Sequence, residues 1–239
     1  RDTYFHKDDQ ASDHSMGYGD YSAIGHAHFM WLGALIRTVH PNATSVFDLG
    51  TAEGSLLKTL RLAGFSHGAG IEFNQACVAK CRAEGFDVIE GDVLDFKPAA
   101  TFDVVCATAF LEHVRDIRHV LGIARELCKP GGVFLFEIPV IAGDPQADSV
   151  LLSTSLEHVL YFTEESIRTC VASIFGEQSV VTREVCTEGC AATVVGVAFT
   201  PPVDALAHSA AKLITLRDAG SQALLDAEIA RRLTELKQC

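Results

Sequence analysis

The sequence predicts an α/β fold built on a mostly parallel sheet, and three observations lead to that prediction. Short apolar runs alternate with helical segments between residues 45 and 140, which is typical of repeated strand–helix units. The expected strands are apolar along nearly their whole length, as strands are when helices cover both faces of a sheet. The first strand, residues 45–50, passes directly into a glycine-containing turn.

The expected elements follow from apolar periodicity and from turn residues. Residues 21–39 carry apolar side chains at steps of three and four, which predicts a helix that ends before Pro41 and Asn42. In the alternating region we expect strands at 45–50, 68–72, 87–90, 102–106 and 133–140 and helices at 54–62, 74–84 and 116–128. The last of these helices is expected to end at the turn sequence of residues 129–132, Lys-Pro-Gly-Gly.

After residue 140 the alternation stops. A helix is expected at 163–175, and two strands at 179–184 and 191–199 flank a turn-prone segment, which predicts an antiparallel hairpin. The result is a seven-stranded sheet with helices on both faces. We therefore divide the chain into an N-terminal lid segment and helix (1–39), a sheet domain (40–202) and a C-terminal amphipathic helix or linker (203–239).

Composition narrows the class of protein. The chain has 239 residues, 48% of them hydrophobic and 21% charged, as in an ordinary globular protein. Its 19 Lys and Arg against 31 Asp and Glu leave a net charge of −12, so we expect no broad nucleic-acid surface. Eight scattered cysteines indicate reduced thiols and a cytoplasmic location. The longest apolar stretch, 132–143, is interrupted by Glu137, so no membrane span is expected.

One turn has the pattern of a nucleotide-binding loop. Asp48 ends the first strand, and Gly50, Ala52 and Gly54 follow before the next helix, with Glu72 at the end of the second strand. A carboxylate at the end of the second strand can accept hydrogen bonds from ribose hydroxyls. By itself the pattern fits an NAD-dependent oxidoreductase or a methyltransferase. The spacing Gly-x-Ala-x-Gly and the preceding Asp48 weigh against a dinucleotide pyrophosphate, which needs amide donors and no neighbouring negative charge.

Later segments favour the second class. Five segments resemble, in their order and spacing, those of class I S-adenosylmethionine-dependent methyltransferases. They are the loop, the segment 91–93 (Gly-Asp-Val), the strand 102–105, the segment 110–114 (Phe-Leu-Glu-His-Val) and the turn 129–132. The resemblance covers about residues 45–200 and is greatest to the branch of ubiquinone-biosynthesis O-methyltransferases and sugar methyltransferases. It implies a Rossmann-like fold and S-adenosylmethionine as the cofactor. Ala52 departs from the family, which usually has glycine there.

The resemblance also implies a role for each matching residue. The methionine part of the cofactor would face Asp48 and the loop backbone of Gly50, Thr51, Ala52 and Gly54. Glu72 would bind the ribose. Asp92 would bind the adenine amino group, and Phe73 and Val93 would flank the ring. Thr108 and Ala109, just after the fourth strand, would lie beside the sulfonium.

An oxygen nucleophile usually needs a base or a metal ion to remove its proton. Two Glu-His pairs are candidates, Glu112-His113 after the fourth strand and Glu157-His158 after the fifth. The stretch 157–163 resembles the Glu-His-x-x-x-Phe-Ser/Thr segment of sugar methyltransferases, where this histidine is a candidate base, so we rank His158 ahead of His113. Either histidine could instead only fasten a loop. No residues have a coherent metal-ligand spacing, so no metal site is predicted.

The sequence therefore predicts methyl transfer to a hydroxyl of a small molecule or glycan by general-base catalysis. Two alternatives stay open: a catalytically silent methyltransferase-like scaffold, and a methyltransferase that acts on RNA or protein. The residues after 203 lie beyond the resemblance. Their apolar face could pack on its own domain, pair with a second chain, or begin a linker to a further domain of a longer polypeptide.

Overall fold

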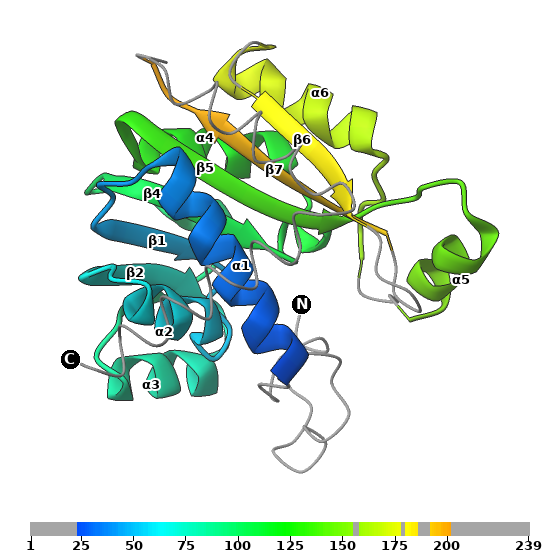
Figure 1. The fold of residues 1–239 in the computed structure, drawn as a ribbon. Helices are drawn as coiled ribbons and strands as arrows, with labels where there is room; N and C mark the ends of the chain where they lie inside the picture. Colours follow the sequence, from blue (N-terminus) through cyan, green and yellow to red (C-terminus); the bar gives the residue numbers. More distant parts are fainter. Residues whose placement is uncertain (1–22, 155–157, 178–179, 186–191, 202–239) are drawn as a thin grey trace.

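A seven-stranded sheet forms the centre of the fold (Figure 1). The computed structural model describes residues 23–154, 158–177, 180–185 and 192–201. The strands lie in the order β3-β2-β1-β4-β5-β7-β6. Their bounds are β1 Ser45–Leu49, β2 His67–Glu72, β3 Asp87–Glu90, β4 Phe102–Thr108, β5 Cys128–Pro139, β6 Val180–Val185 and β7 Thr193–Phe199. Strands β1 to β5 are parallel, and β7 is antiparallel to both β5 and β6.

Helices cover both faces of this sheet. Helices α1 (Ala23–Val39), α2 (Ser55–Leu62) and α3 (Gln75–Ala83) bury their apolar side chains against one face. Helices α4 (Ile117–Leu127) and α6 (Glu164–Phe175) do so against the other face. Helix α5 (Pro145–Thr154) projects to one side of the sheet (Figure 1). The central strands β1, β4 and β5 therefore pack between two apolar layers, which explains their largely apolar sequences.

Side-chain caps set the first residue of several helices. Asn74 accepts hydrogen bonds from two backbone N–H groups in the first turn of α3, and Asp116 accepts one in the first turn of α4. Thr163 and Ser166 form a reciprocal capping box at the start of α6. These polar side chains satisfy backbone donors that have no partner within the helix.

The predicted architecture is confirmed: a mostly parallel sheet, helices on both faces, and a C-terminal antiparallel hairpin. Two details differ from the prediction. Helix α5 was not predicted, because Val150, Leu151 and Leu152 are consecutive and do not recur at helical steps. Residues 129–132 were assigned to a turn, but they belong to β5, which begins at Cys128. Their Pro and Gly residues accompany a shift of register against β4 inside the strand, as at a β-bulge.

Several predictions concern residues outside the described ranges. The lid segment before residue 23, Glu157 and the C-terminal region 203–239 are among them. Across the ranges that the structure describes, no helix combines the length and apolarity needed to cross a membrane.

Candidate active site

The predicted site residues lie at the carboxyl ends of the parallel strands. Asp48 is in β1, Glu72 ends β2, and Thr108 ends β4. Glu137, which was not predicted, lies near the end of β5. In open α/β sheets this edge is where ligands bind, because loops and helix N-termini converge there. The topology thus brings together side chains that are far apart in the sequence.

The loop after β1 has an unusual backbone. Gly50, Ala52 and Gly54 have φ angles of 76°, 44° and 78°, all in the left-handed region. Gly50 must also be glycine for a second reason, because a Cβ atom there would collide with the ring of Phe110. Ala52 adopts a conformation that is costly for any residue with a Cβ atom. The loop therefore turns sharply and brings its backbone close to the end of β1.

Glu72 fastens this loop to the neighbouring strand. One carboxylate oxygen accepts a hydrogen bond from Ala52 N at 2.8 Å, and the other accepts one from Asn74 N at 2.7 Å. The side chain was expected to bind a ribose, and these backbone bonds were not foreseen. Because a carboxylate offers about four acceptor positions, both functions are compatible.

Asp48 lies beneath the loop and is almost completely buried. Within the described part of the chain, its Oδ1 atom has no hydrogen-bond partner. Burial, followed by the nearby charge of Glu72, raises the pKa of Asp48 well above its ordinary value. A buried carboxylate without a partner fits a cationic ligand group, and the amino group of S-adenosylmethionine is such a group.

The three residues expected around an adenine lie in different environments. Asp92 accepts a hydrogen bond from Leu94 N at 2.9 Å and caps the 3₁₀ turn Val93–Asp95. The side chain of Val93 is buried in the core, whereas Phe73 is 51% exposed at the end of β2. Asp92 thus has a structural partner already, and contacts of these three residues with an adenine stay a prediction.

The end of β4 carries a second strained residue. Ala109 has a φ angle of 46°, and its N–H group donates to Glu137 O at 3.0 Å. Thr108, the preceding residue, is paired with Glu137 in the sheet register. Sequence reasoning did not foresee this strain, which persists because the surrounding sheet determines the backbone path.

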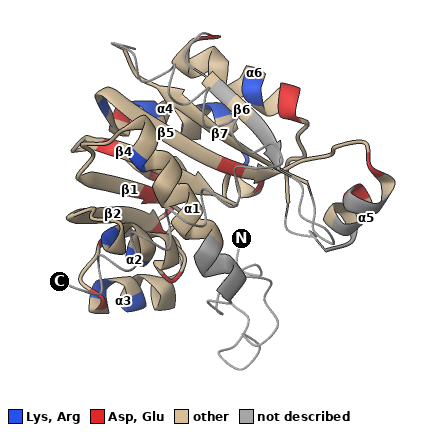
Figure 2. Cartoon of the chain, in the orientation of Figure 1, with Lys and Arg blue, Asp and Glu red and all other residues tan. Residues whose placement is uncertain are grey.

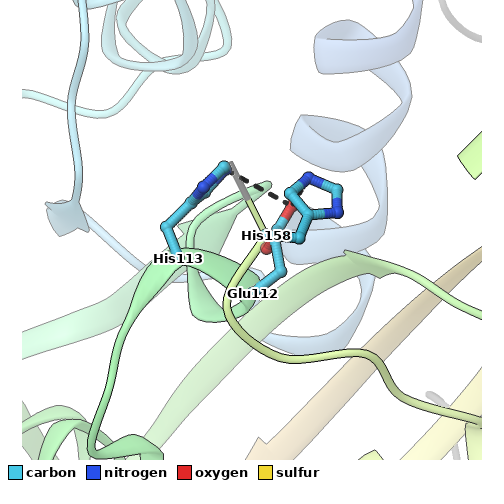
Figure 3. Close-up of side chains that lie close together, drawn as sticks. All are labelled: Glu112, His113 and His158. Atoms are coloured by element: carbon cyan, nitrogen blue, oxygen red, sulfur yellow. Dashed lines mark ion pairs between the residues drawn. The ribbon is translucent and has the colours of Figure 1, made fainter. Parts of the chain in front are cut away.

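The three predicted catalytic residues come together (Figure 3). Glu112 Oε1 lies 3.9 Å from His113 Nε2 and 3.9 Å from His158 Nε2, between the two rings. The rings meet edge to face, with centroids 4.9 Å apart. The backbone N–H groups of Val159 and Leu160 donate to Glu112 O, so the loop that carries His158 is bound to the residue that carries the carboxylate.

Burial controls the protonation of this cluster. Glu112 is 1% exposed, and neither of its carboxylate oxygens has a hydrogen-bond partner among the residues that the structure describes. Burial raises the pKa of Glu112 to about 8, and the charge of Glu137 contributes in the same direction. Burial, and then the charge of His113, lowers the pKa of His158 to about 4. His158 is therefore neutral near pH 7, with a lone pair to accept a proton.

Two further ionisable residues belong to the site. His28 Nε2, from α1, lies 2.7 Å from Glu137 Oε1, from β5. This contact brings the first described helix to the carboxyl edge of the sheet. Sequence reasoning placed His28 in a lid segment and gave Glu137 no role. The signal was present, because Glu137 is the acidic residue that interrupts the longest apolar stretch.

Acidic side chains lie on the strands that form the site, whereas several Lys and Arg residues lie in the last turns of the helices (Figure 2). The acidic side chains come from β1, β2 and β5, whereas Lys and Arg lie on helices such as α2, α3 and α4. This distribution favours a cationic ligand at the edge of the sheet.

Comparison with known proteins agrees with this geometry. Residues 27–174 match the family model described as a methyltransferase domain. The chain is 33% identical over 116 residues to the ubiquinone biosynthesis O-methyltransferase of Paramagnetospirillum magneticum. That alignment covers 46% of this chain and 45% of the relative, so the chain spans less than half of the curated relative it matches.

Solved structures share the fold. An S-adenosylmethionine-bound amino pentose methyltransferase from Micromonospora echinaspora has a TM-score of 0.55 at 17% identity, covering 72% of this chain and 91% of its own. The N-methyltransferase of Bradyrhizobium japonicum, in complex with S-adenosylhomocysteine, has a TM-score of 0.57 at 14% identity, covering 82% of this chain and 94% of its own.

Proposed function

Because this chain belongs to the methyltransferase-domain family, with S-adenosylmethionine as its cofactor, we propose that it methylates a hydroxyl group of a small molecule or glycan. The observation that carries the proposal is the position of the Glu112–His113–His158 cluster. Glu112 and His113 follow β4, at the same sheet edge as the loop after β1, and His158 reaches them from the segment before α6.

The cofactor would be held by the residues at the ends of β1 and β2. Asp48 would pair with its amino group, because that buried carboxylate has an atom without a partner. Glu72 would accept from the ribose while it keeps the loop in place through Ala52 N. When bound, S-adenosylmethionine supplies an electrophilic methyl group and its own leaving group.

The chain itself must then orient the acceptor and remove one proton. In this proposal Nε2 of His158 would accept the proton of the acceptor hydroxyl, whose oxygen would take the methyl group in place of the cofactor sulfur, the leaving group. Glu112 lies 3.9 Å from that nitrogen and would favour the resulting imidazolium when it is ionised. His113 meets the ring of His158 edge to face and would hold its orientation.

The first experiment measures binding and transfer separately. Calorimetry with S-adenosylmethionine and S-adenosylhomocysteine tests the cofactor, and we expect one site per chain. Transfer of a labelled methyl group is then measured to a panel of phenols, sugars and amino sugars. Absence of cofactor binding would refute the proposal, and methylation of amines alone would refute the choice of a hydroxyl.

The same panel separates the alternatives. Adding RNA and protein substrates tests for a macromolecular acceptor, which the net charge of −12 disfavours in the case of RNA. Tight cofactor binding with no turnover of any acceptor would favour a silent scaffold.

A further inference from the structure

The Glu112–His113–His158 cluster also has the chemistry of a metal site. Each residue offers one donor atom, and the three donors all lie within 4.8 Å of one another. Two come from consecutive residues of the 3₁₀ turn Leu111–His113, and the third comes from the loop before α6. Backbone bonds from Val159 and Leu160 to Glu112 O fasten the two segments together, so the set is held by the fold.

Among the described residues, no hydrogen bond satisfies the carboxyl group of Glu112. Its two oxygens are buried, and Oε1 lies 3.9 Å from Nε2 of His113 and 3.9 Å from Nε2 of His158 (Figure 3). A buried carboxylate oxygen with an imidazole nitrogen on each side favours a cation among the three donors.

We propose that Glu112, His113 and His158 bind a divalent transition-metal ion of the zinc class, with at least one coordination position open. Two imidazole nitrogens and one carboxylate oxygen are the ligand types that such ions prefer, whereas Mg²⁺ and Ca²⁺ prefer oxygen alone. Metal–ligand bonds of about 2.0–2.1 Å in a tetrahedral site place ligand atoms about 3.3 Å apart. Glu112 Oε1 lies 3.9 Å from each Nε2 atom and all three donors lie within 4.8 Å, so metal binding requires the donors to move inward.

Metal binding would regulate the proposed reaction. A nitrogen lone pair that is donated to a metal cannot accept a proton, so the ion would block His158 as a base. This consequence rests on the proposed function, whereas metal binding itself does not.

The test measures binding directly on the full chain. Protein stripped with a chelator is titrated with ZnCl₂ by calorimetry, without cofactor or acceptor, and Co²⁺ is added in parallel to record its visible absorption. We expect one equivalent of zinc and a Co²⁺ spectrum of a four- or five-coordinate site without thiolate charge transfer. Each of the variants Glu112→Gln and His113→Ala should weaken zinc binding at least about tenfold.

His119→Ala is the matched control, because His119 lies on α4 and contacts Leu94 O rather than the cluster. Its zinc affinity should equal that of the native chain. Circular dichroism of each variant checks its fold, and His158→Ala serves as a third ligand variant if one of the others does not fold. No zinc binding, or equal binding in the native chain and the ligand variants, would overturn the proposal. Zinc binding without inhibition of methyl transfer would leave the site intact and count against His158 as the base.

Discussion

Glu72 Oε2 accepts a hydrogen bond from Ala52 N at 2.8 Å, and this bond joins the loop after β1 to the end of β2. The other oxygen of Glu72 binds Asn74 N at 2.7 Å. One side chain therefore sets the paths of two segments that flank the proposed cofactor site. The position of Glu72 at the end of β2 was predicted from the sequence, but its hydrogen bond to the loop was not.

The variant Glu72→Gln tests whether these two hydrogen bonds stabilise the loop. A glutamine keeps one acceptor oxygen but turns an NH₂ group toward one of the two backbone donors. We expect the free energy of unfolding to fall by about 1–3 kcal/mol, because one donor loses its charged acceptor. Affinity for S-adenosylmethionine should fall as well. Urea unfolding and calorimetry measure the two effects, and an unchanged stability would contradict the structural role.

Asp48→Asn should separate binding from stability. Asp48 is buried, and its Oδ1 atom has no hydrogen-bond partner in the described ranges, so removing the charge relieves a desolvation cost. We expect the variant to be at least as stable as the native chain. Its affinity for the cofactor should be lower by about 10- to 100-fold, because a charge-assisted bond is lost. A variant that is both weaker in binding and less stable would indicate a structural role for Asp48.

Two substitutions of Ala52 test the backbone conformation of the loop after β1. Its φ angle of 44° costs a residue with a Cβ atom about 1–2 kcal/mol. Ala52→Gly should change stability by less than about 1 kcal/mol, since the relief of strain is offset by the greater freedom of the unfolded chain. Ala52→Val should lower stability by about 2 kcal/mol or more, because a β-branched side chain fits this region poorly. Thermal unfolding of the pair measures the difference, and equal midpoints would contradict the assigned conformation.

His158→Gln tests the proposed base. We expect the turnover number to fall about 100-fold or more, since a positioned base contributes that order of rate. Cofactor affinity should be unchanged, because the variant leaves the loop after β1 intact. His119→Gln is the control and should retain the native rate. A small effect at His158 together with a large one at His113→Gln would reverse their roles.

The strand–helix alternation was sufficient to predict the sheet because its central strands are apolar on both faces, and the structure confirms this arrangement. The prediction failed where local signals were ambiguous. The Pro and Gly residues of 129–132 mark a register shift inside β5, and the same residues also occur in turns. Helix α5 has no apolar repeat that could have predicted it.

The candidate site shows a second limit of sequence reasoning. Glu112 and His113 are adjacent in the chain, but no spacing rule connects them with His158. Only the parallel order of β4 and β5 brings the three together, so the sequence predicted separate candidate bases and no metal ligands. The contact between His28 and Glu137 likewise depends on tertiary packing.

The hydrogen bonds of Asp103 predict how the free energy of unfolding depends on pH. Its carboxylate accepts bonds from the N–H groups of Thr44 and Ser45 at 2.9 Å each and from Lys129 Nζ at 2.8 Å. Burial alone would raise its pKa, but these bonds outweigh burial and hold the pKa of Asp103 well below its ordinary value.

A group with a lowered pKa in the folded state adds stability above its unfolded pKa, near 3.9, and that stability is lost as the pH falls through the folded value. Asp103→Asn should therefore lower the free energy of unfolding by about 2–3 kcal/mol at pH 7. The difference between the native chain and the variant should shrink as the pH falls below about 4. Asp87→Asn, at an exposed position of β3, is the matched control and should follow the native curve. Urea unfolding from pH 7 to pH 3 measures all three chains, and a difference that stays constant with pH would show that the charge of Asp103 is not what stabilises this end of the sheet.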